Sequence, residues 1–131
     1  MKVVTFNIRC DYGQDGLNEF ANRKELILRK INQEKPDIIG FQEVLPHVAK
    51  WLKENLNEYY VIGCGRGVNL RDEQMSIAYR RDRINLISMK TWWLSQTPDV
   101  PGSRYEEQSS CPRTATEAVL KILRTIRYFD Y

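Results

Sequence analysis

Residues 37–43 read Asp37-Ile38-Ile39-Gly40-Phe41-Gln42-Glu43, a short and nearly continuous apolar run that ends in two polar side chains. Such a run is typical of a strand that is covered on both faces. Residues 2–8 alternate apolar and polar side chains with a period of two, which predicts a strand. Between these strands, residues 19–34 carry an apolar stripe at helical spacing, and Pro36 ends the predicted helix. The three segments predict two parallel strands joined by a right-handed crossover.

The rest of the chain predicts one further helix and several more strands. Pro46 opens the helix, and apolar side chains at three- and four-residue spacing continue as far as Leu56. Strands are expected over residues 59–63, 77–80, 84–88 and 114–120, and another is expected to start within 125–131. Residues 81–83 predict a tight turn that joins two of these strands as a hairpin. The order of elements predicts an α/β fold, a layered α/β sandwich with a mixed sheet, in a single domain over residues 1–131.

The composition excludes several classes of protein. The chain has 131 residues, 42% hydrophobic and 28% charged, so it is neither disordered nor collagen-like. Its mean hydropathy is −0.54, and no apolar run approaches the length of a membrane span. The net charge of +3 would suit an anionic ligand such as a phosphate ester, but an ordinary solvated surface is the favoured explanation of it.

The cysteines indicate the compartment. The chain has three cysteines, an odd number, at the widely separated positions Cys10, Cys64 and Cys111. The apolar stretch at the N-terminus is too short for a secretory signal. This usage favours free thiols in a reducing compartment, so a cytoplasmic location is expected.

Two polar residues end the first two predicted strands. Asn7 comes after Phe6, and Glu43 comes after Gln42. The carboxyl ends of parallel neighbours lie on one edge of a sheet, where open α/β sheets bind ligands, so we expect these two side chains to meet. Amide and carboxylate oxygens suit Mg²⁺ or Mn²⁺. The alternative is that Asn7 forms a turn and Glu43 is a charge at the start of a helix.

Several stretches of the sequence resemble the endonuclease/exonuclease/phosphatase superfamily. Its first two motifs are similar to residues 5–9, Thr-Phe-Asn-Ile-Arg, and to residues 36–44, Pro-Asp-Ile-Ile-Gly-Phe-Gln-Glu-Val. One bacterial branch is also similar over residues 63–67, 77–83, 93–98 and 111–116. The order and spacing of these motifs carry the resemblance from residue 2 to about residue 120.

The resemblance implies a DNase I-like fold and metal-dependent hydrolysis of phosphate esters. Glu43 matches the carboxylate that holds the catalytic Mg²⁺ (or Mn²⁺), and Asn7 matches its companion near the metal. A metal there would polarise a phosphoryl oxygen. Arg113 occupies a position that faces the active-site edge in similar sequences and would bind a substrate phosphate, although a structural role is equally open. Tyr79 is expected in the core.

Beyond these motifs, the sequence departs from the family pattern. The family's Thr-His motif, its Asp-x-Asn pair and its closing Ser-Asp-His are not found. The single histidine, His47, matches no catalytic position of the family and is interpreted as a surface or helix-start residue. The chain is therefore expected to be a truncated, N-terminal half of the fold that binds metal weakly and has little hydrolytic activity alone, because a nucleophilic water needs a general base.

Two other functions remain open. The chain is alternatively a non-catalytic interaction domain that self-associates or pairs with a complementary chain, because half a sandwich exposes a wide apolar face. A nucleic-acid-binding module is less favoured: it would stack bases on residues such as Trp92 and Trp93 and bind phosphates through Arg71 and residues 80–83. The sequence does not specify which phosphate ester is the substrate.

Overall fold

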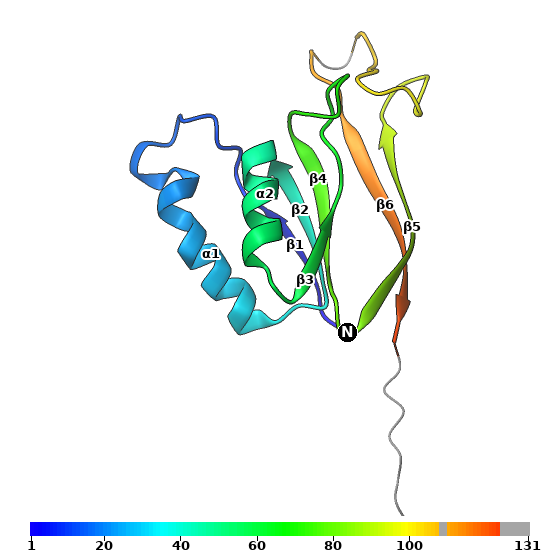
Figure 1. Cartoon of the computed structure of the whole chain (residues 1–131). Helices are drawn as coiled ribbons and strands as arrows, with labels where there is room; N and C mark the ends of the chain where they lie inside the picture. Colours follow the sequence, from blue (N-terminus) through cyan, green and yellow to red (C-terminus); the bar gives the residue numbers. More distant parts are fainter. Residues whose placement is uncertain (108–109, 124–131) are drawn as a thin grey trace, which may run out of the picture.

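The computed structural model describes residues 1–107 and 110–123, which form three layers (Figure 1). The elements in chain order are β1 (Val3–Asn7), the 3-10 helix η1 (Gly16–Asn18), α1 (Phe20–Glu34), β2 (Ile38–Val44), α2 (Pro46–Asn55), β3 (Tyr59–Ile62), β4 (Gln74–Arg80), β5 (Ile84–Trp93) and β6 (Thr114–Ile122). Both α-helices cover one face of a four-stranded sheet, and β5 and β6 form a second sheet on its other face.

The larger sheet is mixed, as predicted. Its strand order is β1-β2-β4-β3. β1 and β2 are parallel, with Val3 opposite Ile38 and Asn7 opposite Gln42. β4 is antiparallel to both of its neighbours. The α/β sandwich and its parallel pair of strands are therefore confirmed.

The core lies between the helices and the larger sheet. α1 buries Phe20, Ile27 and Ile31, three members of its predicted stripe. These side chains pack in one cluster with Ile39 and Phe41, which are almost fully buried on β2. Packing of this one cluster holds β1 and β2 in place, and with them the sheet edge where both strands end. Within the described residues, no helix is both long and apolar enough to cross a membrane.

The predicted hairpin at residues 81–83 is wrong. β4 pairs with β2 and β3, whereas β5 pairs only with β6 in the other sheet, among the strands that the structure describes. The turn therefore carries the chain from one layer to the next. Asp37 fixes its position, because the Arg83 guanidinium donates to the Asp37 carboxylate at 2.7 Å and the Arg80 amide donates to the Asp37 carbonyl at 2.9 Å.

Three strands are longer than the sequence pattern predicted, and β6 exceeds its prediction by only two residues, ending at Ile122 rather than residue 120. β4 begins at Gln74 rather than residue 77, because Gln74 and Ser76 bond each other at 2.7 Å and so enter the buried sheet as a satisfied polar pair. β5 extends to Trp93 rather than residue 88, because residues 89–93 continue to pair with β6 as far as Thr114. The strand expected within residues 125–131 lies outside the described residues.

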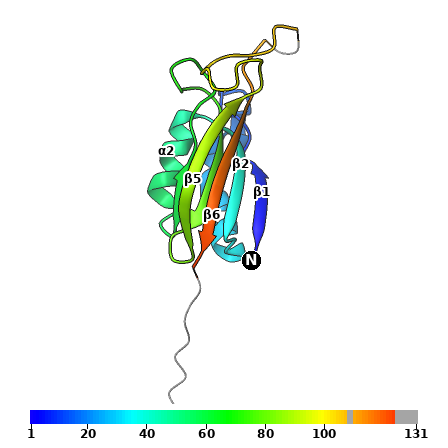
Figure 2. The same ribbon diagram turned by 90° about the vertical axis from the view of Figure 1, so that its right-hand side faces the viewer.

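The smaller sheet covers only part of the larger one. Figure 2 shows β5 and β6 in front, with β1 and part of β2 beside them rather than beneath them. β1 is also an end strand, paired with β2 alone among the described strands. The side of β1 that faces away from the helices is consequently exposed at Val3, Thr5 and Asn7.

Candidate active site

A β-bulge at the end of β2 directs Glu43. The pairing of β2 with β4 shifts register between Phe41 and Val44, and Glu43 adopts a left-handed backbone conformation with φ 62°. A bulge re-aims a side chain at the end of a strand, and a non-glycine residue at positive φ is uncommon. Here the bulge separates Glu43 from the regular alternation of β2 while Val44 is fully buried.

Hydrogen bonds from two other segments hold the Glu43 carboxylate. Asn7 Nδ2 donates to Oε1 at 3.0 Å, and the backbone amide of Cys10 donates to Oε2 at 2.8 Å. These two bonds, in that order of importance, lower the pKa of Glu43 below its ordinary value, and nearby Arg9 adds to the effect. Glu43 is therefore ionised at neutral pH and fixed in orientation.

The structure brings Asn7 and Glu43 together, as the strand ends predicted. The Asn7 amide nitrogen points to Glu43, and its oxygen accepts from the Arg9 backbone amide at 2.9 Å. In this arrangement Asn7 orients the carboxylate, and its oxygen faces the chain just beyond β1. The left-handed conformation of Arg9, with φ 69°, allows this short turn.

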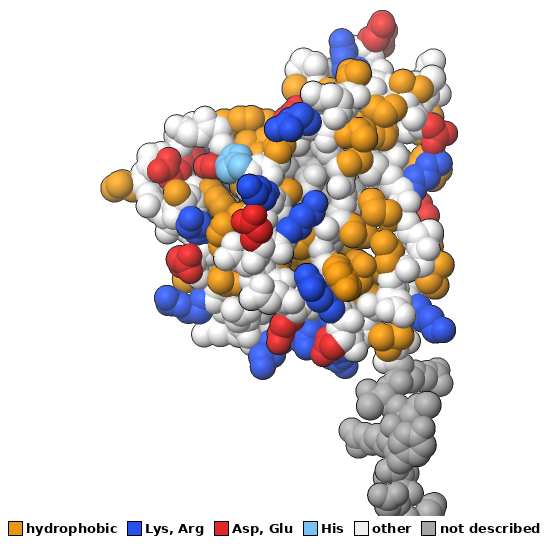
Figure 3. Space-filling model, in the orientation of Figure 1, with side chains coloured by type: hydrophobic (Ala, Val, Ile, Leu, Met, Phe, Trp, Pro, Cys, Tyr) orange, Lys and Arg blue, Asp and Glu red, His pale blue; other side chains and the backbone are white. Residues whose placement is uncertain are grey.

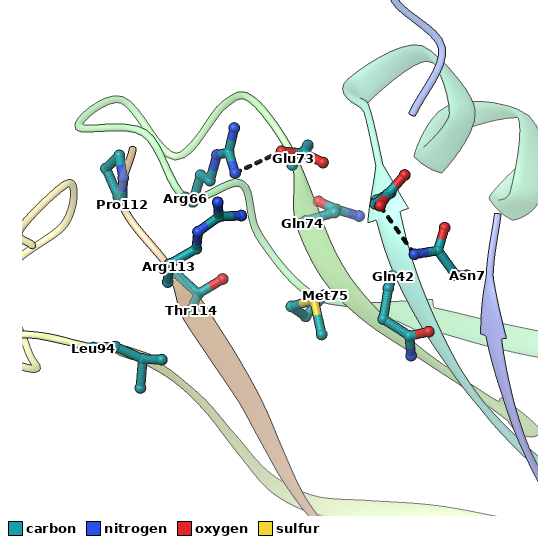
Figure 4. A pocket seen from close by; sticks show the side chains of 11 residues that line it. Asn7, Gln42, Arg66, Glu73, Gln74, Met75, Leu94, Pro112, Arg113 and Thr114 are labelled. Carbon is teal, nitrogen blue, oxygen red and sulfur yellow. Dashed lines mark hydrogen bonds and ion pairs between the residues drawn. The ribbon is translucent and has the colours of Figure 1, made fainter. Parts of the chain in front are cut away.

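Glu43 and Asn7 open onto a pocket of about 360 Å³ that lies between the two sheets. Figure 4 shows Arg66 and Arg113 on one side of this pocket and Asn7 on the other, with Glu73 and Gln74 between them. Arg113 directly precedes β6, and its carbonyl accepts from the Leu94 amide at 2.8 Å, which ties it to the end of β5. The three predicted site residues thus line one pocket, although they come from three separate segments of the chain.

Arg66 also lines this pocket and was not predicted as a site residue. Its side chain is only 10% exposed and makes ion pairs with Asp72 at 3.1 Å and Glu73 at 2.5 Å. The Trp93 indole donates to the Arg66 carbonyl at 2.8 Å. A charged residue inside the glycine-rich stretch 63–67 was the available signal. These contacts make Arg66 an anchor for the loop over residues 63–73.

A divalent cation at Glu43 is compatible with the groups that are present. The carboxylate is ionised, and each oxygen accepts one hydrogen bond, so lone pairs remain for a metal. Within residues 1–107 and 110–123, no three His, Cys, Asp or Glu side chains are grouped to hold a metal ion. A single carboxylate with waters and phosphate oxygens suits Mg²⁺, which usually keeps several waters.

His47 lies in the first turn of α2 and is exposed, as predicted. Its Nε2 atom is 2.7 Å from Asp11 Oδ2. The other Asp11 oxygen accepts from the Phe20 amide at the start of α1, at 3.3 Å. His47 does not line the Glu43 pocket, so this pair joins the starts of two helices.

The tyrosine predicted in the core and the residues of the alternative nucleic-acid site are buried or make contacts within the protein. Tyr79 and Trp93 are each only 5% exposed, in agreement with a core position. Trp92 is partly exposed, and its indole donates to Glu117 at 3.0 Å. Arg80 pairs with Asp82 at 3.0 Å, and Arg81 stacks over the Tyr60 ring at 4.4 Å.

Known proteins are similar to this chain in both sequence and fold. A profile of the Endonuclease/Exonuclease/phosphatase family matches residues 4–105. A solved endonuclease/exonuclease/phosphatase from Bacteroides vulgatus is 37% identical, with a TM-score of 0.83 over 90% of this chain and 45% of its own. The mannosyl-6-phosphatase of Bacteroides thetaiotaomicron is 30% identical, with a TM-score of 0.85 over 93% of this chain and 46% of its own.

A viral protein is also similar to this chain in sequence. An uncharacterised protein of Acanthamoeba polyphaga mimivirus is 32% identical over 108 residues, which are 77% of this chain and 40% of the viral protein. The chain thus spans less than half the length of each of these three relatives.

Proposed function

Because the chain belongs to the endonuclease/exonuclease/phosphatase family, we propose that it carries the metal-binding and phosphate-binding part of an active site that hydrolyses phosphate esters. One observation supports this proposal above the others: Glu43, Asn7 and Arg113 line the same pocket, although 106 positions separate Asn7 from Arg113. The pocket brings an ionised carboxylate and an exposed guanidinium to one solvent-accessible space.

Each side chain has a separate role in this proposal. Glu43 holds Mg²⁺ or Mn²⁺, which supplies a positive charge that polarises a phosphoryl oxygen. Asn7 and the Cys10 amide keep the carboxylate ionised and oriented. Arg113 donates its guanidinium hydrogens to phosphate oxygens, a geometry that favours two parallel bonds. Arg66 is held by its two carboxylates and fixes the wall of the pocket.

We infer that the chain alone turns over substrate slowly. The water that attacks phosphorus needs a general base within hydrogen-bond reach. Glu43 and Glu73 are the carboxylates among the residues that line the pocket, and Glu73 is paired with Arg66. Glu43 is assigned to the metal in this proposal, so the described lining offers no further group for proton transfer.

Metal binding tests the proposal independently of turnover. Mn²⁺ is paramagnetic, so we expect it to broaden the amide NMR signals of Asn7 and Cys10 in the wild-type chain. Glu43→Ala should abolish this broadening, whereas Glu25→Ala, which removes an exposed carboxylate on α1, should leave it intact. Equal broadening in wild type and Glu43→Ala would contradict the assignment of the metal to Glu43.

The solved mannosyl-6-phosphatase makes mannose 6-phosphate the first substrate to test. We expect slow, Mg²⁺-dependent release of phosphate that is lost in Glu43→Ala. Arg113→Ser should weaken binding of the sugar phosphate while metal binding persists. Unchanged sugar phosphate binding in Arg113→Ser would remove Arg113 from the phosphate site.

A second candidate function is pairing with a complementary chain or with another copy. It is favoured by β1, which pairs with β2 alone among the described strands, and by apolar side chains on the smaller sheet: Ile87 is 64% exposed and Val119 is 46% exposed. An unpaired strand edge beside an apolar surface is a template for association. Sedimentation velocity over a range of concentrations tests self-association.

A further inference from the structure

The segment between β1 and η1 passes beside the metal-binding end of the candidate active site. Within it, the Cys10 backbone amide donates to the Glu43 carboxylate at 2.8 Å. The carboxylate of the next residue, Asp11, lies 2.7 Å from the His47 ring at the start of α2. The His47 side chain, pale blue in Figure 3, marks the place where the segment is attached to α2. Hydrogen bonds thus fix the two residues that precede Tyr12.

Tyr12 links this segment to the loop over residues 63–73. Its hydroxyl donates to Asp72 Oδ1 at 3.1 Å, and Asp72 Oδ2 accepts from Arg66 Nε, also at 3.1 Å. Arg66 makes its second ion pair with Glu73. Arg66 and Glu73 line the candidate pocket, whereas Tyr12 does not. The Tyr12 hydroxyl therefore connects the two segments from outside the pocket.

The Cys10 side chain closes these contacts into a ring. It is only 6% exposed, and burial raises the pKa of its thiol to about 11. The side chains of Tyr12 and Glu73 are close enough to the thiol to interact with it electrostatically. The residue whose amide orients Glu43 is therefore packed against side chains of both segments that Tyr12 joins.

Backbone strain is concentrated around this ring. Among the described residues, five that are not glycine have a positive φ, and three of these are Arg9 at 69°, Glu43 at 62° and Asp72 at 76°. Arg9 directly precedes Cys10, Glu43 accepts from the Cys10 amide, and Asp72 accepts from Tyr12. Left-handed conformations of this kind are unfavourable and persist only where surrounding contacts hold them. The contacts of Tyr12 therefore help to hold backbone positions that would otherwise relax.

The loop over residues 63–73 is in turn connected to Arg113 through the end of β5. The buried Trp93 indole donates to the Arg66 carbonyl at 2.8 Å. The next residue, Leu94, donates its amide to the Arg113 carbonyl at 2.8 Å. These hydrogen bonds form a continuous path, so a displacement of the loop is transmitted to the wall that carries Arg113.

We propose that Tyr12 is a positioning residue that couples the two binding groups of the pocket. Its hydroxyl fixes the segment that orients Glu43 relative to the loop that holds the wall near Arg113. A metal at Glu43 and a phosphate at Arg113 then lie at a defined separation, and the strength of their attraction depends on that separation. This inference rests on the proposed function and adds to it a residue that lies outside the pocket.

Calorimetric titration of the full chain with inorganic phosphate tests the inference. Titrations are made in a chelator and in saturating Mg²⁺, and the ratio of the two phosphate affinities measures the coupling between the ligands. By thermodynamic linkage, phosphate tightens Mg²⁺ binding by the same factor. We expect phosphate to bind wild type about tenfold tighter in Mg²⁺, which lies within the usual range for two coupled ligands.

Tyr12→Phe keeps the aromatic ring and removes only the hydroxyl. We expect the coupling to fall by about threefold or more, which corresponds to the loss of one hydrogen bond. Phosphate affinity in the chelator should stay at the wild-type value, because Arg113 is unchanged. Mg²⁺ affinity without phosphate should also stay, because Asn7 and the Cys10 amide still orient Glu43.

Two further variants show whether the effect belongs to the hydrogen bond between Tyr12 and Asp72. Tyr60→Phe removes a hydroxyl from an exposed tyrosine on β3, outside the pocket, and should show wild-type coupling. Asp72→Gly removes the acceptor, and glycine tolerates the positive φ of this position. In the Asp72→Gly background, Tyr12→Phe should not change the coupling further, because the hydrogen bond is already absent. Amide NMR spectra verify that every variant is folded.

The failure of this inference is distinguishable from the failure of the proposed function. Wild-type coupling in Tyr12→Phe would overturn the inference and leave the proposed function intact. Weaker binding of each ligand alone in Tyr12→Phe would make the hydroxyl a structural group, and a further loss of coupling in the Asp72→Gly background would exclude Asp72 as its partner; either result overturns the inference. If Mg²⁺ and phosphate bind wild type independently, they do not share a pocket, and the proposed function and the inference both fail.

Discussion

At the scale of single residues, Glu43 is the side chain on which the candidate site depends. Its hydrogen bonds from Asn7 and Cys10 lower its pKa below the ordinary 4.5. When folding lowers the pKa of a carboxyl group, the folded state is stabilised at every pH above the ordinary pKa of that group. This stabilisation is lost as the pH falls through the lowered pKa of the folded state. The side chain of Asn7 and the backbone of Cys10 each donate a hydrogen bond to the Glu43 carboxylate. Glu43→Gln replaces one of the two accepting oxygens by an NH₂ group, so we expect the free energy of unfolding to fall by about 1–2 kcal/mol near neutral pH.

Urea unfolding in the presence of a chelator measures this effect without a contribution from metal. The difference between wild type and Glu43→Gln should narrow as the pH falls below 4.5, because the wild-type carboxylate then takes up a proton. Glu25→Gln, on the exposed face of α1, should show no comparable loss. A difference that stays constant down to acidic pH would mean that ionisation of Glu43 does not stabilise the fold.

Sequence reasoning predicted the convergence of Asn7 and Glu43 because topology alone decides it: parallel strands place their carboxyl ends on one edge. The β-bulge that aims Glu43 was not predicted. A glycine is the usual sequence signal of a positive φ, and Glu43 adopts a positive φ without being a glycine. Arg66 was missed for a related reason. Its place in the glycine-rich stretch 63–67 marks it, but its burial depends on ion pairs with Asp72 and Glu73, which lie six and seven positions after it.

At the scale of elements, the loop over residues 63–73 is the segment with the strictest packing requirement. Gly65→Ala would place a Cβ atom 2.2 Å from the Arg71 carbonyl oxygen, so the loop backbone must move. Overpacking of this kind costs about 1–3 kcal/mol, and we expect that loss in urea unfolding together with shifted amide signals for Arg66 and Arg71.

Gly40→Ala is the matched control for this substitution. Gly40 lies within β2, and an added Cβ atom there would meet Gln42 Nε2 at an ordinary 3.9 Å. Its effect on the free energy of unfolding should be smaller than that of Gly65→Ala. Equal stability of Gly65→Ala and wild type would show that the loop tolerates the added group and is not fixed by close backbone contact.

The order of helices and strands was predictable from periodicity, but the pairing of the later strands was not. Residues 81–83 have the composition of a hairpin turn, and local composition does not reveal whether the next strand joins the same sheet or another. The turn is held in the structure by Asp37, which is 46 positions away from Arg83 and contacts the turn through both its side chain and its backbone. The local pattern therefore predicted the wrong partner for β5, because the pairing of β5 with β6 joins segments about 30 positions apart.

At the scale of the whole molecule, the layers leave apolar surface without a covering element among the described residues. Ile87 and Val119 are exposed on the smaller sheet, and β1 ends the larger one. Burial of apolar area is favourable by about 25 cal/mol per Å², so contact between two such surfaces gains free energy. We therefore expect reversible self-association in sedimentation velocity, with the mean mass rising from micromolar to near-millimolar concentration.

The double variant Ile87→Ser/Val119→Ser tests whether the smaller sheet carries this association. It removes two exposed apolar side chains that make no contribution to the buried core, so the chain should stay folded and become more monomeric. Leu17→Ser is the matched control, because Leu17 is 88% exposed on η1 and lies outside both sheets. The Leu17→Ser variant should associate like wild type. A wild-type chain that sediments as a monomer across the whole range would exclude pairing with another copy, and the phosphate-ester site would then be the function to pursue.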